Sequence, residues 1–227
     1  MKRIIEEDFM KRSSETVSAI IDSLENLPSL KLEELVGKAV LIVIDMNYGF
    51  ARGGALYSPR IEALIPEVLR IAHSFAKEID IPLIFVNEDH PKDAIEFSEY
   101  PAHCVRGTKE IEIIDELKSI ENKILIGKNC TNAFAVDEFK EKLVRLTEKD
   151  IKEIVIIGDC TDICVYQAAV SIKTFFNHNN IDARIIVPMN AVDTYDLHIA
   201  NHNGDLMNVV FLFSMLENGV EVVKEIK

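Results

Sequence analysis

The chain of 227 residues lacks any hydrophobic run close to the roughly 20 residues that a membrane-spanning helix needs. Its first residues mix acidic and basic side chains, without the apolar stretch of a secretory signal peptide. Cysteines number only four, which does not resemble the disulfide framework of a small secreted protein. We therefore expect a protein of the reducing cytoplasm that does not act at a membrane.

Positive charge is also scarce. Lys and Arg number 25 against 38 Asp and Glu, which gives a formal net charge of −13 at pH 7. No basic patch stands out, and phosphate groups of nucleic acids need clustered Lys and Arg for binding. The charge therefore argues against nucleic acid as a partner, although it says little about a small substrate.

Hydrophobic residues, 48% of the chain, are present in short runs that alternate with helical patterns. The runs that predict strands are residues 39–45, 81–88, 123–128, 153–158 and 183–188, with a possible sixth at 220–223. The helical patterns between them cover residues 59–78, 111–119, 136–146, 164–176 and 199–216. Strands that are apolar on both faces and separated by helices are typical of a parallel sheet covered on both sides. The sequence predicts a three-layer α/β/α domain with an open, mostly parallel, doubly wound sheet.

The first part of the chain stands outside this alternation. Apolar residues at helical spacing in residues 4–24 predict one or two amphipathic helices. We expect residues 1–37 to form a helical extension that packs on the core or on a second subunit. Residues 38–227 would then form the main domain.

Polar residues follow the predicted strands at one edge of the sheet. In open parallel sheets, binding sites form beyond the carboxyl ends of the strands. Reading only those ends selects Asp45, Glu88, His90, Lys128 and Cys164. We therefore expect an acid, a possible metal-binding pair, a base and a possible nucleophile in one site.

Cys164 opens a predicted helix after a strand and a short polar turn. Unpaired N–H groups and the helix dipole at such a place stabilise a thiolate and can hold an oxyanion. Asp45 could accept the thiol proton if burial raises its pKa, and Lys128 could balance the charges. Each residue alone also has a plainer interpretation. These are a small buried hydrophobe for Cys164, a turn or N-cap acid for Asp45, and a solvated lysine for Lys128.

Glu88 and His90 lie two residues apart on an extended segment, so their side chains project to the same side. His103 lies in a polar loop that could fold back over the strand ends. One carboxylate and two imidazoles suit Zn²⁺, Fe²⁺ or Mn²⁺. Spacing alone leaves such a metal site open.

Five motifs between residue 39 and the C-terminus resemble those of the isochorismatase-like cysteine hydrolases, and within them the nicotinamidases. They read IDMNYGFARGGAL, NEDHPKDAIEF, YPAHCVRGT, GKNCTNAF and GDCTDICV. The resemblance implies an amidohydrolase that converts nicotinamide to nicotinate and ammonia through a thioester, a reaction of NAD salvage. It also implies a homo-oligomer.

The resemblance also implies a role for each site residue. It makes Asp45 the proton acceptor, Lys128 its partner and Cys164 the nucleophile. The metal ligands that it implies are Glu88, His90 and His103. They would hold a divalent ion that anchors the pyridine ring, with zinc as the first choice and iron, manganese or magnesium as alternatives.

Further features of the pocket come from the same resemblance. Backbone N–H groups of Ile163 and Cys164 would form the oxyanion hole. The family's cis peptide would fall at Cys160–Thr161. The side chains that would line the ring pocket are Phe50 and Phe134.

The chain departs from the family pattern in its metal motif. Glu88 stands where the family has Asp, and Ala94 where it often has His. Two alternatives therefore stay open. One is a metal-free family member that hydrolyses another small amide or an enol ether, and the other is a non-catalytic member kept as a binding subunit.

Overall fold

The structure is a computed structural model that describes residues 8–77 and 80–227. Its centre is a seven-stranded sheet in the order β3-β2-β1-β4-β5-β7, with β6 paired to β4. The strands are β1 (Ala39–Ile44), β2 (Leu83–Glu88), β3 (Lys123–Lys128), β4 (Glu153–Asp159), β5 (Arg184–Pro188), β6 (Val192–Asp193) and β7 (Glu221–Val223). Their pairings are parallel. The predicted doubly wound sheet is confirmed, including the strand expected near residue 220, whereas the two-residue β6 was not predicted.

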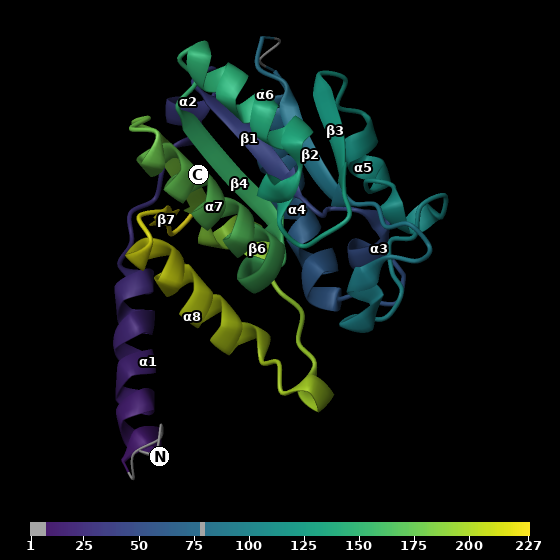
Figure 1. The fold of residues 1–227 in the computed structure, drawn as a ribbon. Coiled ribbons are helices and arrows are strands. Elements are labelled where there is room, and N and C mark those ends of the chain that lie inside the picture. The colour runs from purple at the N-terminus through teal and green to yellow at the C-terminus, as the bar shows by residue number, and fades with distance from the viewer. Residues whose placement is uncertain (1–7, 78–79) are drawn as a thin grey trace.

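Helices cover both faces of the sheet, as Figure 1 shows. They are α1 (Phe9–Glu25), α2 (Leu32–Leu35), α3 (Tyr48–Ala51), α4 (Pro59–Phe75), α5 (Asp115–Lys118), α6 (Asp137–Glu148), α7 (Tyr166–His178) and α8 (Gly204–Glu217). The helix predicted from residue 199 begins at Gly204, because a 3₁₀ turn occupies residues 198–200. Among the described helices, none combines the length and the apolar character needed to cross a bilayer.

Two hydrophobic cores lie on opposite faces of the sheet. Leu41 and Val43 of β1 contribute to the core beneath α2, α3, α4 and α5. Val40, Ile42 and Ile44 contribute to the other core, together with residues of α1, α6, α7 and α8. Because successive side chains of a strand point to opposite faces, a continuous apolar run supplies both cores at once.

The N-terminal helix α1 lies beside α8 and extends past the body of the domain (Figure 1). Leu24 in its last turn is buried, whereas Phe9 and Met10 at its start are exposed. After the helix, the Leu30 N–H donates to the carbonyl oxygen of Glu225 at 3.0 Å, which fastens the segment to the C-terminus. Within the predicted extension, α1 and α2 are the helical parts that the structure describes. Residues 1–7, and Glu78 at the end of another predicted helix, lie outside the described part.

Gly158 lets β4 pass close to β1 immediately before the strand ends. It pairs with Ile44 in the sheet and has φ +114°, a conformation that favours glycine. A Cβ atom at this position would lie 2.0 Å from the carbonyl oxygen of Ile44. A side chain here would therefore push the two central strands apart.

We expect Gly158→Ala to lower the free energy of unfolding by at least about 3 kcal/mol, measured by urea denaturation, because steric overlap adds to backbone strain. Gly107→Ala is the matched control, since Gly107 has φ +84° but open space where the alanine methyl group would lie. That variant should lose only about 1–2 kcal/mol, the cost of the left-handed conformation. Equal losses in the two variants would contradict the close approach of β4 to β1.

Candidate active site

Four polar side chains meet at the carboxyl ends of the central strands. Asp45 follows β1, Glu88 ends β2, and Lys128 ends β3, directly beside Glu88 in the sheet. Cys164 lies in a π-helical turn (Thr161–Val165) that follows β4. All four are 5% exposed or less. The parallel sheet thus brings together residues that are far apart in sequence, as the strand ends predicted.

The ammonium group of Lys128 is the centre of this cluster. Its Nζ lies 2.8 Å from Asp45 Oδ2, 3.0 Å from Glu88 Oε1 and 3.6 Å from Cys164 Sγ. The other oxygen of Asp45 accepts a hydrogen bond from the Glu88 N–H at 2.8 Å. A buried charge is tolerated only when it is paired and hydrogen-bonded. The two carboxylates therefore hold Lys128 in place and are held by it.

Burial governs ionisation in this cluster. It raises the pKa of Asp45 to about 6, an effect that the Lys128 charge opposes and the Glu88 charge reinforces. Burial also raises the pKa of the Cys164 thiol well above its usual value, with Lys128 again acting in the opposite direction. Burial lowers the pKa of Lys128, but Asp45, Cys164 and Glu88 together raise it well above its ordinary value.

These shifts differ from the expectation of a thiolate stabilised by a helix end. Cys164 lies in a tight π turn, buried beside two carboxylates, and these surroundings disfavour a negative sulfur. Burial beside these groups therefore favours the neutral thiol of Cys164. The carboxylate of Asp45, whose pKa burial raises to about 6, lies within 4.8 Å of the sulfur.

A second cluster surrounds the other oxygen of Glu88. Oε2 lies 2.7 Å from His103 Nε2 and 3.3 Å from His90 Nε2. Glu96, on a short 3₁₀ helix (Ile95–Ser98), joins them, and one potential ligand atom from each of the four residues lies within 4.8 Å of the others. Glu96 Oε1 is buried without a hydrogen-bond partner. Two carboxylates and two imidazoles, with one oxygen left unsatisfied, fit a divalent cation.

A hydrogen bond at Nδ1 fixes the orientation of each histidine ring in this cluster. His90 Nδ1 contacts Asn129 Oδ1 at 2.8 Å, and His103 Nδ1 contacts the carbonyl oxygen of Pro101 at 2.7 Å. Both rings therefore turn Nε2 towards Glu88, which is the arrangement that supports histidine as a metal ligand. The loop carrying His103 folds back over β2 as predicted, because the His90 N–H donates to the carbonyl oxygen of Cys104 at 3.0 Å.

The carboxylate of Glu88 stays ionised between the two clusters. Burial favours its neutral form, but the Lys128 charge and hydrogen bonds from His103 and His90 together place its pKa well below the usual value. Burial lowers the pKa of each histidine, but the hydrogen bond to Glu88, the Glu88 charge and the partner of each Nδ1 atom together raise both histidine pKa values above the usual value.

Glu96 was not predicted from the sequence. The family pattern points to position 94 for a further histidine, but Ala94 is buried and carries no donor. Glu96 lies two residues further along the same motif. An acidic residue that follows Glu88 and His90 so closely could have been selected from the sequence as a further metal ligand.

A cavity of about 420 Å³ opens beside both clusters. Its walls include Glu88, Glu96, His103 and Cys164. Phe50 also lines it, as predicted. Phe134 is not among the lining residues, and its ring instead packs on Phe175 of α7, with the ring centroids 5.2 Å apart. The structure therefore places Phe134 outside the lining of this cavity, because its 3₁₀ helix (Ala133–Ala135) directs the ring against α7.

The turn that carries the nucleophile differs from its prediction in one bond. The cis peptide lies at Asp159–Cys160, one position before the predicted Cys160–Thr161, because β4 runs to Asp159 and the π turn already begins at Thr161. The Ile163 N–H, predicted for the oxyanion hole, donates to the carbonyl oxygen of Cys160 at 3.1 Å.

A family model described as the isochorismatase domain matches residues 39–214. The chain belongs to the isochorismatase family. Nicotinamidase 1 of Arabidopsis thaliana is 29% identical to this family member over 210 residues, which cover 82% of this chain and 85% of that protein. These findings confirm the family that the five motifs predicted.

Two solved structures resemble this isochorismatase-like hydrolase. A nicotinamidase from Bacillus subtilis matches with a TM-score of 0.65 and 25% identity, covering 82% of this chain and 99% of that chain. The pyrazinamidase of Pyrococcus horikoshii, in complex with zinc, matches with a TM-score of 0.64 and 25% identity over 82% and 98% of the two chains. The relatives place this hydrolase in the nicotinamidase branch of the family.

Proposed function

We propose that this protein hydrolyses nicotinamide, or a closely similar small aromatic amide, to the carboxylate and ammonia. Its class, an amide-hydrolysing enzyme of the isochorismatase family, follows from its relatives. The observation that carries the reaction is the buried Lys128 ammonium within 3.6 Å of Asp45, Glu88 and Cys164. The names of the relatives, nicotinamidase and pyrazinamidase, support an aromatic ring amide as the substrate.

The first half-reaction uses Cys164 and Asp45. The sulfur attacks the amide carbonyl carbon while Asp45 accepts the thiol proton, and its pKa of about 6 leaves it ionised near neutral pH yet more basic than an ordinary aspartate. The tetrahedral intermediate then breaks its C–N bond, and protonated Asp45 returns the proton to the departing ammonia. A thioester on Cys164 remains.

The second half-reaction reverses these roles with water. Asp45 takes a proton from a water molecule, whose oxygen attacks the thioester carbon and releases the carboxylate. The Cys164 sulfur recovers a proton as it leaves. Lys128 stays protonated throughout because its pKa is raised well above its ordinary value, and it acts as a fixed positive charge.

We propose that the oxyanion hole lies in the turn that carries Cys164. The backbone N–H groups of Ile163 and Cys164 are the donors next to the nucleophile in its turn. The Ile163 N–H would have to leave the carbonyl oxygen of Cys160 to take part. In this site, donors that face the developing negative charge would lower the barrier to attack.

We infer that Glu88, His90, His103 and Glu96 hold a divalent ion. When bound there, the ion would act as a Lewis acid that fixes a ring nitrogen of the substrate. Zinc remains the first choice, with iron, manganese and magnesium as alternatives, and the second carboxylate adds a hard oxygen ligand that manganese and iron also accept. Phe50 lies beside His103, with ring centroids 5.7 Å apart, and offers an apolar surface to an aromatic ring.

The charge of the cavity supports a neutral substrate. Acidic residues line it, and they are Glu88, Glu96, Glu99, Asp159 and Asp196. The described residues along its walls include no Lys or Arg. An amide that carries a carboxylate would find no Lys or Arg on these walls to pair with it, so an uncharged amide suits the cavity better.

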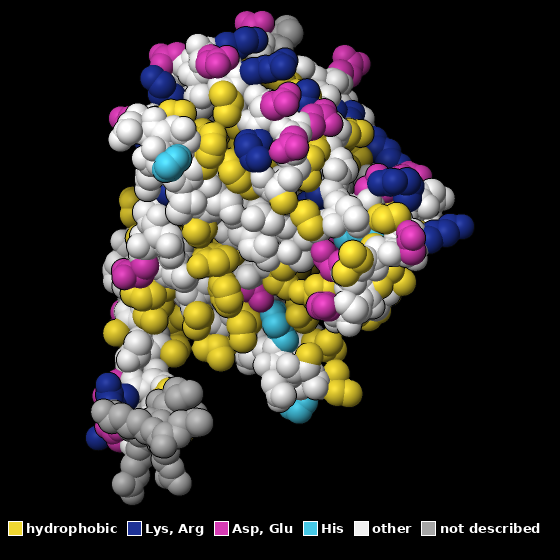
Figure 2. Space-filling view, in the orientation of Figure 1, with side chains coloured by type: hydrophobic (Ala, Val, Ile, Leu, Met, Phe, Trp, Pro, Cys, Tyr) yellow, Lys and Arg dark blue, Asp and Glu magenta, His cyan; other side chains and the backbone are white. Residues whose placement is uncertain are grey.

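Release of nicotinate would give the enzyme a role in NAD salvage, in the cytoplasm. A homo-oligomer is supported by hydrophobic side chains gathered over α8, which Figure 2 shows. Leu206 and Val210 of α8 and Phe9 of α1 are each at least 40% exposed, and they would supply part of a contact between subunits.

Ammonia release from nicotinamide, pyrazinamide and simple aliphatic amides tests the proposed activity. We expect the two ring amides to be hydrolysed far faster than the aliphatic ones. Cys164→Ala should abolish turnover, and Asp45→Asn should lower the rate at least about 10²-fold, because the proton acceptor is lost. Cys130→Ala, at a half-buried cysteine outside the cluster, is the control and should keep full activity. Activity of Cys164→Ala near that of the wild type would eliminate the nucleophile.

Equilibrium dialysis against Zn²⁺, Mn²⁺, Fe²⁺ and Mg²⁺ tests the metal site without reference to activity. We expect one ion per chain, with Glu96→Gln weakening the affinity about 10- to 100-fold because an oxygen ligand is lost. His198→Ala changes an exposed histidine and is the control. Failure of the wild type to take up any of the four ions, or equal affinity in Glu96→Gln, would refute the assignment.

A further inference from the structure

The turn that carries the nucleophile also carries an acid that the proposed mechanism does not use. The side chain of Asp162, two residues before Cys164, is only 6% exposed. Its Oδ1 accepts a hydrogen bond from the Thr194 hydroxyl at 2.6 Å, and its Oδ2 lies 2.8 Å from His202 Nε2. Both partners come from the segment between β6 and α8, so this carboxylate joins the nucleophile turn to a distant part of the chain.

That segment forms one wall of the cavity. Tyr195, Asp196, Leu197 and Ala200 line the cavity, and Figure 1 shows the segment projecting from the body between β6 and α8. It closes into a small hairpin, because the Leu197 N–H donates to the carbonyl oxygen of His202 at 2.9 Å and the reverse bond measures 3.2 Å. The wall and His202 therefore belong to one hydrogen-bonded hairpin.

His202 fixes this hairpin in two further ways. Its Nδ1 lies 3.0 Å from the carbonyl oxygen of Tyr195, so that both ring nitrogens face an oxygen acceptor. Its ring stacks on the Tyr195 ring, with centroids 3.8 Å apart and an interplanar angle of 12°. A continuous series of contacts thus runs from the cavity wall through His202 to Asp162 and the turn of Cys164.

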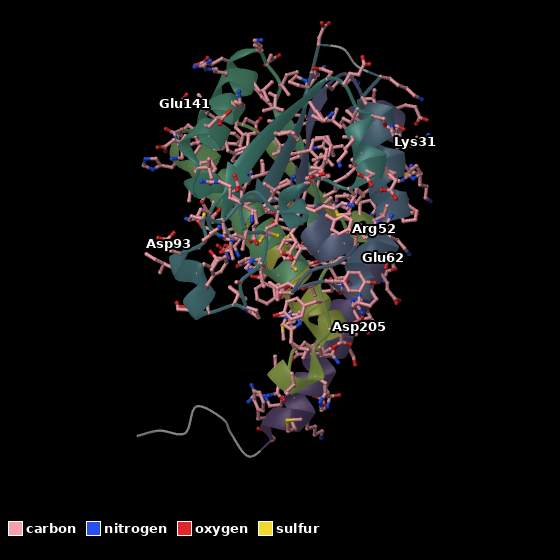
Figure 3. The ribbon with its side chains drawn as sticks, turned by 90° about the vertical axis from the view of Figure 1, so that its right-hand side faces the viewer. Lys31, Arg52, Glu62, Asp93, Glu141 and Asp205 are labelled. Carbon is pink, nitrogen blue, oxygen red and sulfur yellow. The ribbon has the colours of Figure 1, made fainter. Side chains whose placement is uncertain are left out.

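The base of the segment is fastened separately. Arg60 of α4 donates to the carbonyl oxygen of Thr194 at 2.9 Å and pairs with Asp193 at 2.7 Å. It also pairs with Asp205 at 2.8 Å, in the first turn of α8, where Figure 3 labels that residue. Loss of the His202 side chain would therefore leave both ends of the segment attached to the domain.

We propose that His202 is a positioning residue that holds Asp162, and through it the nucleophile turn, against the cavity wall. Without the imidazole, one oxygen of a nearly buried carboxylate loses its partner, and the turn must move to solvate it. Small displacements of a nucleophile cost much of its rate, whereas the ends of the wall stay fixed by Arg60. The kinetic consequences rest on the proposed amidohydrolase activity, but the geometry of the turn does not.

Two amide substitutions separate positioning from simple removal of a histidine. His202→Gln carries its amide nitrogen near the place of Nε2 and can still donate to Asp162. His202→Asn carries it near the place of Nδ1 and falls short of Asp162. His198→Ala, at an exposed histidine on the same hairpin, is the control.

We expect His202→Asn to lower kcat for nicotinamide about 10- to 100-fold, with KM changed much less, because the nucleophile is displaced. His202→Gln should recover most of that loss, and His198→Ala should match the wild type. The rate of alkylation of Cys164 by iodoacetamide, followed by mass spectrometry without substrate, should fall in His202→Asn and recover in His202→Gln. This alkylation reads the turn even if nicotinamide proves not to be the substrate.

A double-mutant cycle tests whether His202 acts through Asp162. We expect His202→Asn combined with Asp162→Asn to be no slower in Cys164 alkylation than the worse single variant, since both break one contact. Additive losses would overturn the proposal. So would equal alkylation rates in the Asn and Gln variants, or an effect confined to KM, because His202 would then only shape the wall.

Discussion

The buried ammonium of Lys128 is the charge on which the site depends. It lies at the end of β3 and contacts a carboxylate after β1, a carboxylate at the end of β2 and the sulfur that follows β4. Burying a lone charge costs several kcal/mol, and burying two carboxylates side by side costs more. The three ionised groups are stable inside the domain only because they are together, so the fold and the reactive arrangement support each other.

Glu88 links this cluster to the second one. One of its oxygens contacts Lys128, and the other faces His90 and His103. The family pattern has an aspartate here, and the additional methylene of glutamate lengthens the side chain that reaches between the two groups. Under the proposed function, a cation held by the histidine cluster would be coupled to the position of Lys128 through this single side chain.

The sequence was sufficient for the features that depend on local pattern. Continuous apolar runs predict a buried parallel sheet, and the residues after those runs are the ones that meet, because parallel strands end at one edge. Asp45, Lys128 and Cys164 were selected in this way. Pattern could not reveal how deeply Cys164 is buried, and that burial raises the pKa of its thiol well above the usual value.

Contacts made by irregular segments could not be predicted from the sequence. Glu96 reaches the histidines because a 3₁₀ helix turns it inward, and Phe134 turns away from the cavity because α7 offers it an aromatic partner. The contact between Asp162 and His202 joins residues 40 positions apart through a hairpin that has no periodic signal. Such contacts are tertiary, and no local propensity encodes them.

The most direct measurement is the formation of a thioester on Cys164, trapped by rapid acid quenching and followed by mass spectrometry of the peptide that contains it. In the wild type, nicotinamide should add one pyridinecarbonyl group to that peptide within a turnover. Lys128→Met, checked for native fold by circular dichroism, should form the same adduct at least about 10²-fold more slowly, because the fixed positive charge is gone. Absence of the adduct from the wild type, or its formation at an unchanged rate in Lys128→Met, would contradict a reaction organised by this buried ammonium.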